Sequence, residues 1–87
     1  MNPIEQYAYE MGIEDVVKKL GNGITSVTLG PWDWSPYLGK LQPELYQLYG
    51  EGYTGIRELE KRLQLSYLDG AKSVGDKYGV TIVTLWD

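Results

Sequence analysis

The chain has 87 residues, a net charge of −4, and neither cysteine nor histidine. This length predicts one domain, residues 1–87. Zinc sites built on Cys and His, thiol nucleophiles and Ser-His-Asp triads are excluded. The sequence also has no Gly-rich phosphate loop and no calcium-binding carboxylate spacing. We therefore expect no catalytic residues, no bound metal and no cofactor.

The opening MNPIEQYAYEM lacks the basic start and the apolar stretch of a secretory signal. No apolar run in the sequence approaches the length that crosses a bilayer. The absence of cysteine suits a reducing compartment. These features predict a soluble, cytoplasmic chain with no membrane partner.

Two apolar stripes with helical spacing occupy the first twenty residues. The first consists of Ile4, Tyr7, Ala8 and Met11, and the second of Ile13, Val16, Val17 and Leu20. On one unbroken helix the two stripes would lie on opposite sides, and Gly12 stands between them. The pattern predicts two short helices, about 3–11 and 13–20, with a break at Gly12.

Two β-branched heptapeptides, residues 23–29 and 79–85, share the pattern Gly, β-branched, Thr, any residue, Val, Thr, Leu. Both are predicted to be strands. The segment from Gly30 to Gln42 contains Pro31, Pro36 and Gly39, which predicts a loop. Helical patterns follow over residues 43–49 and 55–77.

The predicted order is therefore α-α-β-loop-α-α-β. Two helices between the strands make a crossover long enough to join parallel strands. We expect a small α/β (or α+β) domain with a two-stranded sheet, preferably parallel, packed by helices. The predicted core places one face of each strand against the long helix: Val27, Leu29, Leu63, Val74, Val83 and Leu85.

The negative charge is concentrated near the N-terminus. Residues 1–17 contain four acids (Glu5, Glu10, Glu14 and Asp15) and no base, whereas acids and bases balance from residue 18 onward. Basic residues are adjacent only at Lys18-Lys19 and Lys61-Arg62, which argues against direct nucleic-acid binding. The acidic helices are interpreted either as a solvated face or as a surface that meets a basic partner protein.

The most conspicuous local feature is Trp32-Asp33-Trp34, followed by Tyr37. If the strands are parallel, Trp86 and Asp87 join this segment at the carboxyl edge of the sheet, where ligands bind in open α/β folds. The rings complete the core, form a protein interface, or stack on a sugar or nucleotide. The pair Asp33 and Asp87 is the corresponding candidate for acid-base chemistry.

No family motif is recognised. In general character, rather than in particular residues, the chain is similar to the short, acidic, catalytically bare proteins with which viruses block host machinery. We predict a non-enzymatic protein-binding module, an inhibitor or adaptor, with a nucleic-acid mimic or anti-CRISPR-like inhibitor as the favoured case. The predicted partner-binding residues are Trp32, Asp33, Trp34, Tyr37, Glu10, Glu14 and Asp15.

Two alternatives stay open. The first is a sugar or nucleotide binder that uses Trp86 and Asp87, and the second is a small enzyme that uses Asp or Glu. The final strand carries no charge before Asp87. Open, uncharged sheet edges pair readily with another chain, so this strand also predicts a homodimer.

Overall fold

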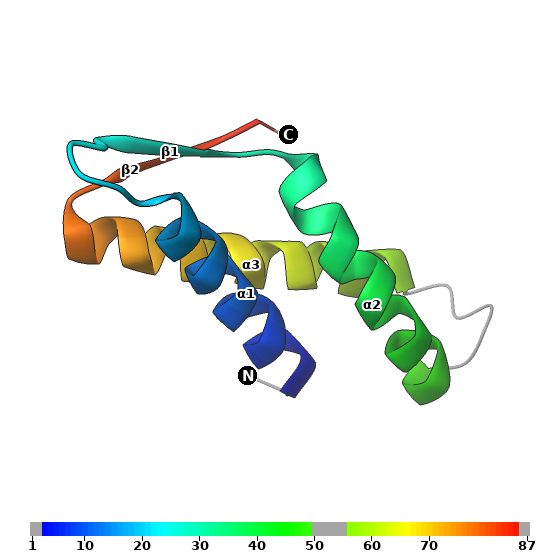
Figure 1. Ribbon diagram of the computed structural model, residues 1–87. Helices are drawn as coiled ribbons and strands as arrows, with labels where there is room; N and C mark the ends of the chain where they lie inside the picture. The colour runs from blue at the N-terminus through cyan, green and yellow to red at the C-terminus, as the bar shows by residue number, and fades with distance from the viewer. Residues whose placement is uncertain (1–2, 50–55, 86–87) are drawn as a thin grey trace.

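The computed structural model describes residues 3–49 and 56–85. Its elements are α1 (Pro3–Lys19), β1 (Ser26–Leu29), α2 (Pro31–Tyr49), α3 (Ile56–Tyr78) and β2 (Thr81–Thr84). The strands form a two-stranded parallel sheet, and the helices lie on one side of it (Figure 1). The predicted α/β class and parallel pairing are confirmed. Within the described ranges, no helix has the length and apolar character to span a membrane.

The predicted break at Gly12 is wrong, because α1 continues through it to Lys19. Gly12 is buried where α1 crosses α3, and a Cβ there would come closer than 3.0 Å to the main-chain carbonyl of Tyr67. Gly70 of α3 lies equally close to the carbonyl of Tyr9. The glycine therefore permits close packing of two helices rather than ending one.

The predicted loop over residues 30–42 is also wrong, because α2 begins at Pro31. Proline is well tolerated at the first helical position, where no N–H is needed. The Asp33 carboxylate accepts the N–H of Gly30 at 2.9 Å, as in one half of a capping box. Pro36 and Pro43 lie inside the helix. The predicted helix over 43–49 is the last part of α2, and that over 55–77 is α3.

The pairing of the two strands shows which residues share each face of the sheet. Val27 pairs with Ile82, and Thr28 pairs with Val83. Val27 and Leu29 are buried against the helices, as predicted, together with Leu63 and Val74. Val83 and Leu85 are 38% and 55% exposed, so their assignment to the core is wrong. Ile82, which shares the inner face with Val27, packs against the core in their place.

Among the residues whose burial the structure describes, the core lies mainly between α1, α3 and the inner face of the sheet. From α2 it includes Trp34 and Leu41, with Tyr37 and Leu38 packed against it. Gly75 of α3 lies close to the main chain just before β2, since a Cβ there would lie 2.6 Å from the carbonyl oxygen of Val80. In the described part of the chain, the buried hydrophobic residues are Ala8, Val16, Val27, Leu29, Trp34, Leu41, Leu63, Tyr67, Ala71 and Val74.

Candidate functional site: the outer face of the sheet

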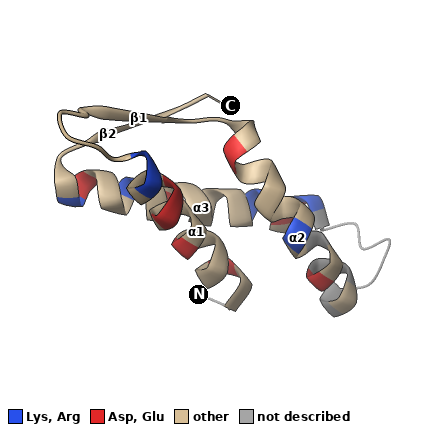
Figure 2. Cartoon of the chain, in the orientation of Figure 1, with Lys and Arg blue, Asp and Glu red and all other residues tan. Residues whose placement is uncertain are grey.

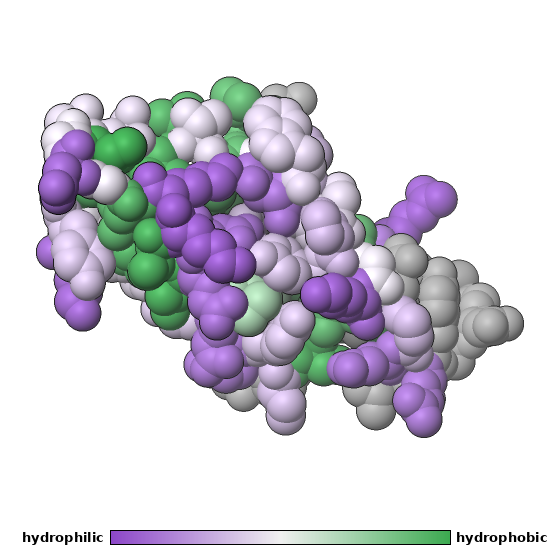
Figure 3. All heavy atoms as spheres, in the orientation of Figure 1, coloured by the Kyte–Doolittle hydropathy of each residue, from purple (hydrophilic) through white to green (hydrophobic). Residues whose placement is uncertain are grey.

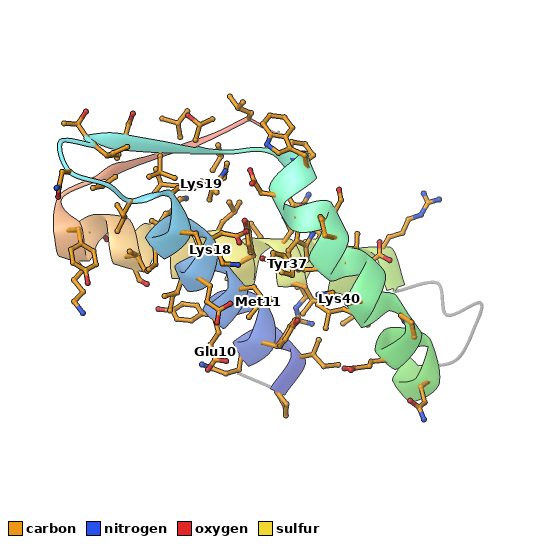
Figure 4. All side chains as sticks on the ribbon, in the orientation of Figure 1. Glu10, Met11, Lys18, Lys19, Tyr37 and Lys40 are labelled. Carbon is orange, nitrogen blue, oxygen red and sulfur yellow. The ribbon has the colours of Figure 1, made fainter. Side chains whose placement is uncertain are left out.

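The first two turns of α2 point the predicted aromatic residues in different directions. Trp34 is buried and its ring packs on Tyr67, with centroids 5.1 Å apart. Tyr37 is half-buried and projects from α2 toward α1 (Figure 4). Trp32 is 61% exposed. The core interpretation therefore applies to Trp34 and in part to Tyr37, and the surface interpretation applies to Trp32, which is the exposed ring among these three residues.

Asp15 lies inside the molecule, at 8% exposure, and its two carboxylate oxygens accept hydrogen bonds from two tyrosines. The Tyr37 hydroxyl donates to Oδ1 at 2.6 Å, and the Tyr67 hydroxyl donates to Oδ2. The cluster therefore joins one side chain from each of the three helices α1, α2 and α3. Because a buried carboxylate is costly without partners, the two hydroxyls account for its position. In this structure the Asp15 carboxylate faces the core rather than a partner.

This cluster predicts a stability that falls at alkaline pH. Burial, followed by the hydrogen bond to Asp15, raises the pKa of Tyr37 and of Tyr67 above the ordinary value of 10.0. The unfolded chain releases these protons near pH 10 while the folded chain keeps them. The free energy of unfolding should therefore decrease as the pH rises above 10.

Urea unfolding at pH 9 and pH 11 measures this decrease. Tyr67→Phe should make it smaller, because one of the two perturbed groups is removed. Tyr78→Phe is the matched control, since Tyr78 is 57% exposed. Equal decreases in wild type, Tyr67→Phe and Tyr78→Phe would contradict the assignment.

Asp33 has two local contacts. Besides accepting the Gly30 N–H, it forms an ion pair with Lys19 at 2.8 Å. These contacts join the start of α2 to the end of α1. The candidate acid-base partner Asp87 and the predicted ligand residue Trp86 lie outside the described residues. Among the described residues, no group of three or more acids could hold a metal ion.

The acidic residues of α1 do not form one exposed row. Glu10 and Glu14 are exposed one helical turn apart, and Figure 4 shows Glu10 projecting away from the other helices. Glu5 is half-buried and lies 3.6 Å from Arg62. With Asp15 buried, the acidic surface predicted from the sequence reduces to Glu10 and Glu14.

The outer face of the sheet carries the largest exposed apolar side chains near the start of α2. The indole of Trp32 occupies the space that a side chain at Gly30 would take. Because side chains alternate along a strand, this space lies on the same side as Thr28. The N–H of Leu85 bonds to the carbonyl of Leu29 at 2.9 Å, which places Leu85 beside this position.

We call this surface the outer sheet face; its exposed residues are Ser26, Thr28, Trp32, Thr81, Val83 and Leu85. None of them is charged, and both strands lack charge entirely (Figure 2). Figure 3 shows hydrophobic atoms at the top of the molecule, over the strands. Purely parallel sheets are generally covered on both faces. In the described part of the chain, helices cover only one.

Sequence reasoning missed this face because it assigned Val83 and Leu85 to the core. The strand carries apolar residues on both sides, and the pair Val83 and Leu85 is more apolar than the pair Ile82 and Thr84. Hydrophobicity alone therefore selects the wrong side. Aligning the two heptapeptides does not correct this assignment. The sequence match places Val27 opposite Val83, whereas the sheet pairs Val27 with Ile82.

A groove lies between α2 and α3, with a volume of about 630 Å³. Trp34, Leu38, Leu65 and Leu68 supply its apolar lining, and Lys61 is among its polar residues. Its volume falls within the range of small-ligand sites. Leu65 is 51% exposed in this groove. It provides a comparison surface for tests of the outer sheet face.

The comparisons with known proteins add no relative. No protein-family model, curated protein sequence or solved structure gives a significant match to this chain.

Proposed function

We propose that this chain is a non-enzymatic protein-binding module that binds its partner through the outer sheet face. The observation that supports this proposal is the exposure of Trp32, Val83 and Leu85 on the uncovered side of a parallel sheet. Tryptophan is enriched among the residues that dominate binding energy at protein interfaces. An exposed, uncharged strand surface with one large ring at its rim suits a protein partner better than a small ligand.

Energetic considerations support the same surface. Burying apolar area contributes roughly 25 cal/mol per Å², and Trp32 and Leu85 are both more than half exposed. Serine and threonine complete the face, and their hydroxyls can exchange water for hydrogen bonds with a partner. A partner would therefore gain apolar burial without removing a charged group from water.

Glu10 and Glu14 supply a second, weaker element of the proposal. They are exposed on α1, away from the outer sheet face, and the net charge of −4 favours an encounter with a basic protein. Exposed charges mainly raise the association rate. In this proposal the acids steer an inhibitor or adaptor toward a basic, nucleic-acid-binding partner, and Trp32 anchors the complex.

The proposal can be tested by capture from a lysate of the source cells, followed by kinetics with the captured protein. Trp32→Ala and Leu85→Ser should each weaken binding by roughly 2 kcal/mol, about 30-fold, mainly through faster dissociation. Leu65→Ser is the matched control, because Leu65 has nearly the same exposure as Leu85 but lines the groove between α2 and α3.

The steering element has its own variant, Glu10→Lys with Glu14→Lys. It should slow association and reduce its salt dependence while leaving dissociation unchanged. Normal binding by the combined Trp32→Ala and Leu85→Ser variant would remove the outer sheet face from the proposal. Weakening by Leu65→Ser alone would move the site to the groove, and failure to capture any protein would oppose a protein-binding function.

A further inference from the structure

The two edges of the sheet differ in their protection. On β1, the carbonyl of Thr28 accepts a hydrogen bond from Lys19 Nζ at 3.2 Å, and Figure 4 shows Lys19 at the end of α1 nearest this strand. A lysine at a sheet edge opposes pairing with another chain. On β2, residues 80–85 carry no charge, and within residues 3–49 and 56–85 the only strand paired with β2 is β1. The β2 edge is thus the unprotected one.

The hydrogen bonds between the strands show which groups of β2 are left for pairing. Thr81 and Leu85 donate their N–H groups to Thr25 and Leu29 of the first strand, at 3.0 and 2.9 Å. Alternate residues of a parallel strand bond to the same neighbour. The N–H and C=O groups of Ile82 and Thr84 therefore point away from β1, toward the open edge.

We propose that the β2 edge pairs antiparallel with β2 of a second copy of this chain, about a two-fold axis at Val83. In this register Ile82 of each copy lies opposite Thr84 of the other, and the four outward groups on each strand form four hydrogen bonds in total. Val83 then faces its own counterpart on the outer side. The product is a four-stranded sheet, ordered β1-β2-β2-β1.

Other two-fold registers fit the strand less well. An axis at Ile82 would require Val80 to pair across the edge, but the Val80 N–H already donates to the carbonyl of Gly75 at 2.8 Å. If the second strand shifted by one residue, the main-chain groups that point toward the open edge would face groups that already bond to β1. Side chains of the outer face would then lie opposite side chains of the inner face. The axis at Val83 uses both residues of β2 whose main-chain groups point outward.

A second copy suits this edge for two further reasons. The chain has a net charge of −4, yet the edge and the outer sheet face are uncharged, so two copies can meet here without opposing their carboxylates. The pairing would also add four main-chain hydrogen bonds to a sheet that has only two short strands in the described residues. This pairing uses main-chain groups of the edge and does not depend on the proposed partner-binding function.

The absence of cysteine from the chain provides a direct test of the register. Facing residues in a non-hydrogen-bonded antiparallel pair have Cα atoms about 4.5 Å apart, within the range for a disulfide. Val83→Cys should therefore form a disulfide-linked dimer under mild oxidation. Thr28→Cys is the matched control, since Thr28 lies on the same face, and its counterpart would be three strand spacings away, about 14 Å. It should remain unlinked.

Sedimentation of the unmodified chain gives an independent measurement. Wild type at micromolar concentration should sediment with twice the monomer mass of 9.9 kDa. Val83→Lys and Val83→Glu should each sediment as monomers, because like charges would meet at the axis, and an equimolar mixture of the two should recover the double mass. Trp32→Ala should remain dimeric, which separates this proposal from the proposed function.

Three outcomes would overturn the proposal. A wild-type chain that stays at the monomer mass would exclude self-pairing and leave the edge to a strand of another protein. A dimer in which Thr28→Cys links as readily as Val83→Cys would have a different interface. A dimer that Val83→Lys and Val83→Glu leave intact would exclude the axis at Val83.

Discussion

Replacing Gly12 or Gly70 with alanine is expected to destabilise the fold by about 3 kcal/mol or more, at the upper end of the effect of overpacking a core. A Cβ at either position would lie closer than 3.0 Å to a main-chain carbonyl of the opposite helix. A side chain could rotate away from such a contact, but a backbone carbonyl within a helix cannot. The two helices would have to separate, and the core between them would lose contacts along its length.

Gly39→Ala provides the matched control for this prediction. Gly39 is exposed within α2, and a Cβ there would have no heavy atom within 4 Å. Alanine is favoured over glycine in a helix by about 1 kcal/mol, so this variant should be more stable than wild type. Urea unfolding followed by circular dichroism compares the three variants. If Gly12→Ala raised the free energy of unfolding as much as Gly39→Ala does, α1 and α3 would not be in close contact at this crossing.

Gly12 also shows why parts of the fold could be predicted from the sequence and others could not. Helical spacing correctly located the long helix α3 and the helical residues of α1, since it depends on local periodicity, but it divided α1 into two helices at Gly12. The meaning of a glycine within such a pattern depends on its surroundings in three dimensions. A helix break and a close helix crossing both favour glycine, and the position of Tyr67 that distinguishes them lies 55 residues further along the chain.

The start of α2 shows a second limit. Pro31, Pro36 and Gly39 predict a loop when each is counted as a helix breaker. The N–H of Gly30 is instead bound by Asp33, Pro31 lies where no N–H is required, and Gly39 is exposed. Once the segment is helical, Trp32, Trp34 and Tyr37 point in different directions. The aromatic cluster was therefore identified from sequence as a candidate site, but its division between core and surface required the structure.

Asp15 shows the same limit for the charged residues. Its position beside Glu14 suggested an acidic surface, but the helix turns these two neighbours to different sides. Asp15 meets Tyr37 and Tyr67, which are 22 and 52 residues away in sequence. Composition correctly identified the excess of acids in the first helix, whereas their distribution between surface and core depended on tertiary contacts.

Leu29→Ala is expected to destabilise the fold by about 2–5 kcal/mol, while Leu85→Ala should cost less than about 1 kcal/mol. Leu29 is fully buried on the inner face of the sheet, so removing its side chain leaves a cavity beside the helices. Leu85 is 55% exposed on the outer sheet face, where water fills the space. The sequence pattern alone assigned both leucines to the core and would have predicted equal losses.

Urea unfolding of wild type and both variants measures this difference, at a protein concentration low enough to keep the chain monomeric. A loss in Leu85→Ala as large as that in Leu29→Ala would mean that β2 turns its other side to the helices. The outer sheet face would then consist of Ile82 and Thr84, and the binding proposal would lose Leu85. A small loss in Leu85→Ala combined with weaker partner binding in Leu85→Ser would instead connect the exposed leucine to function, because the residue would then contribute more to the complex than to the fold.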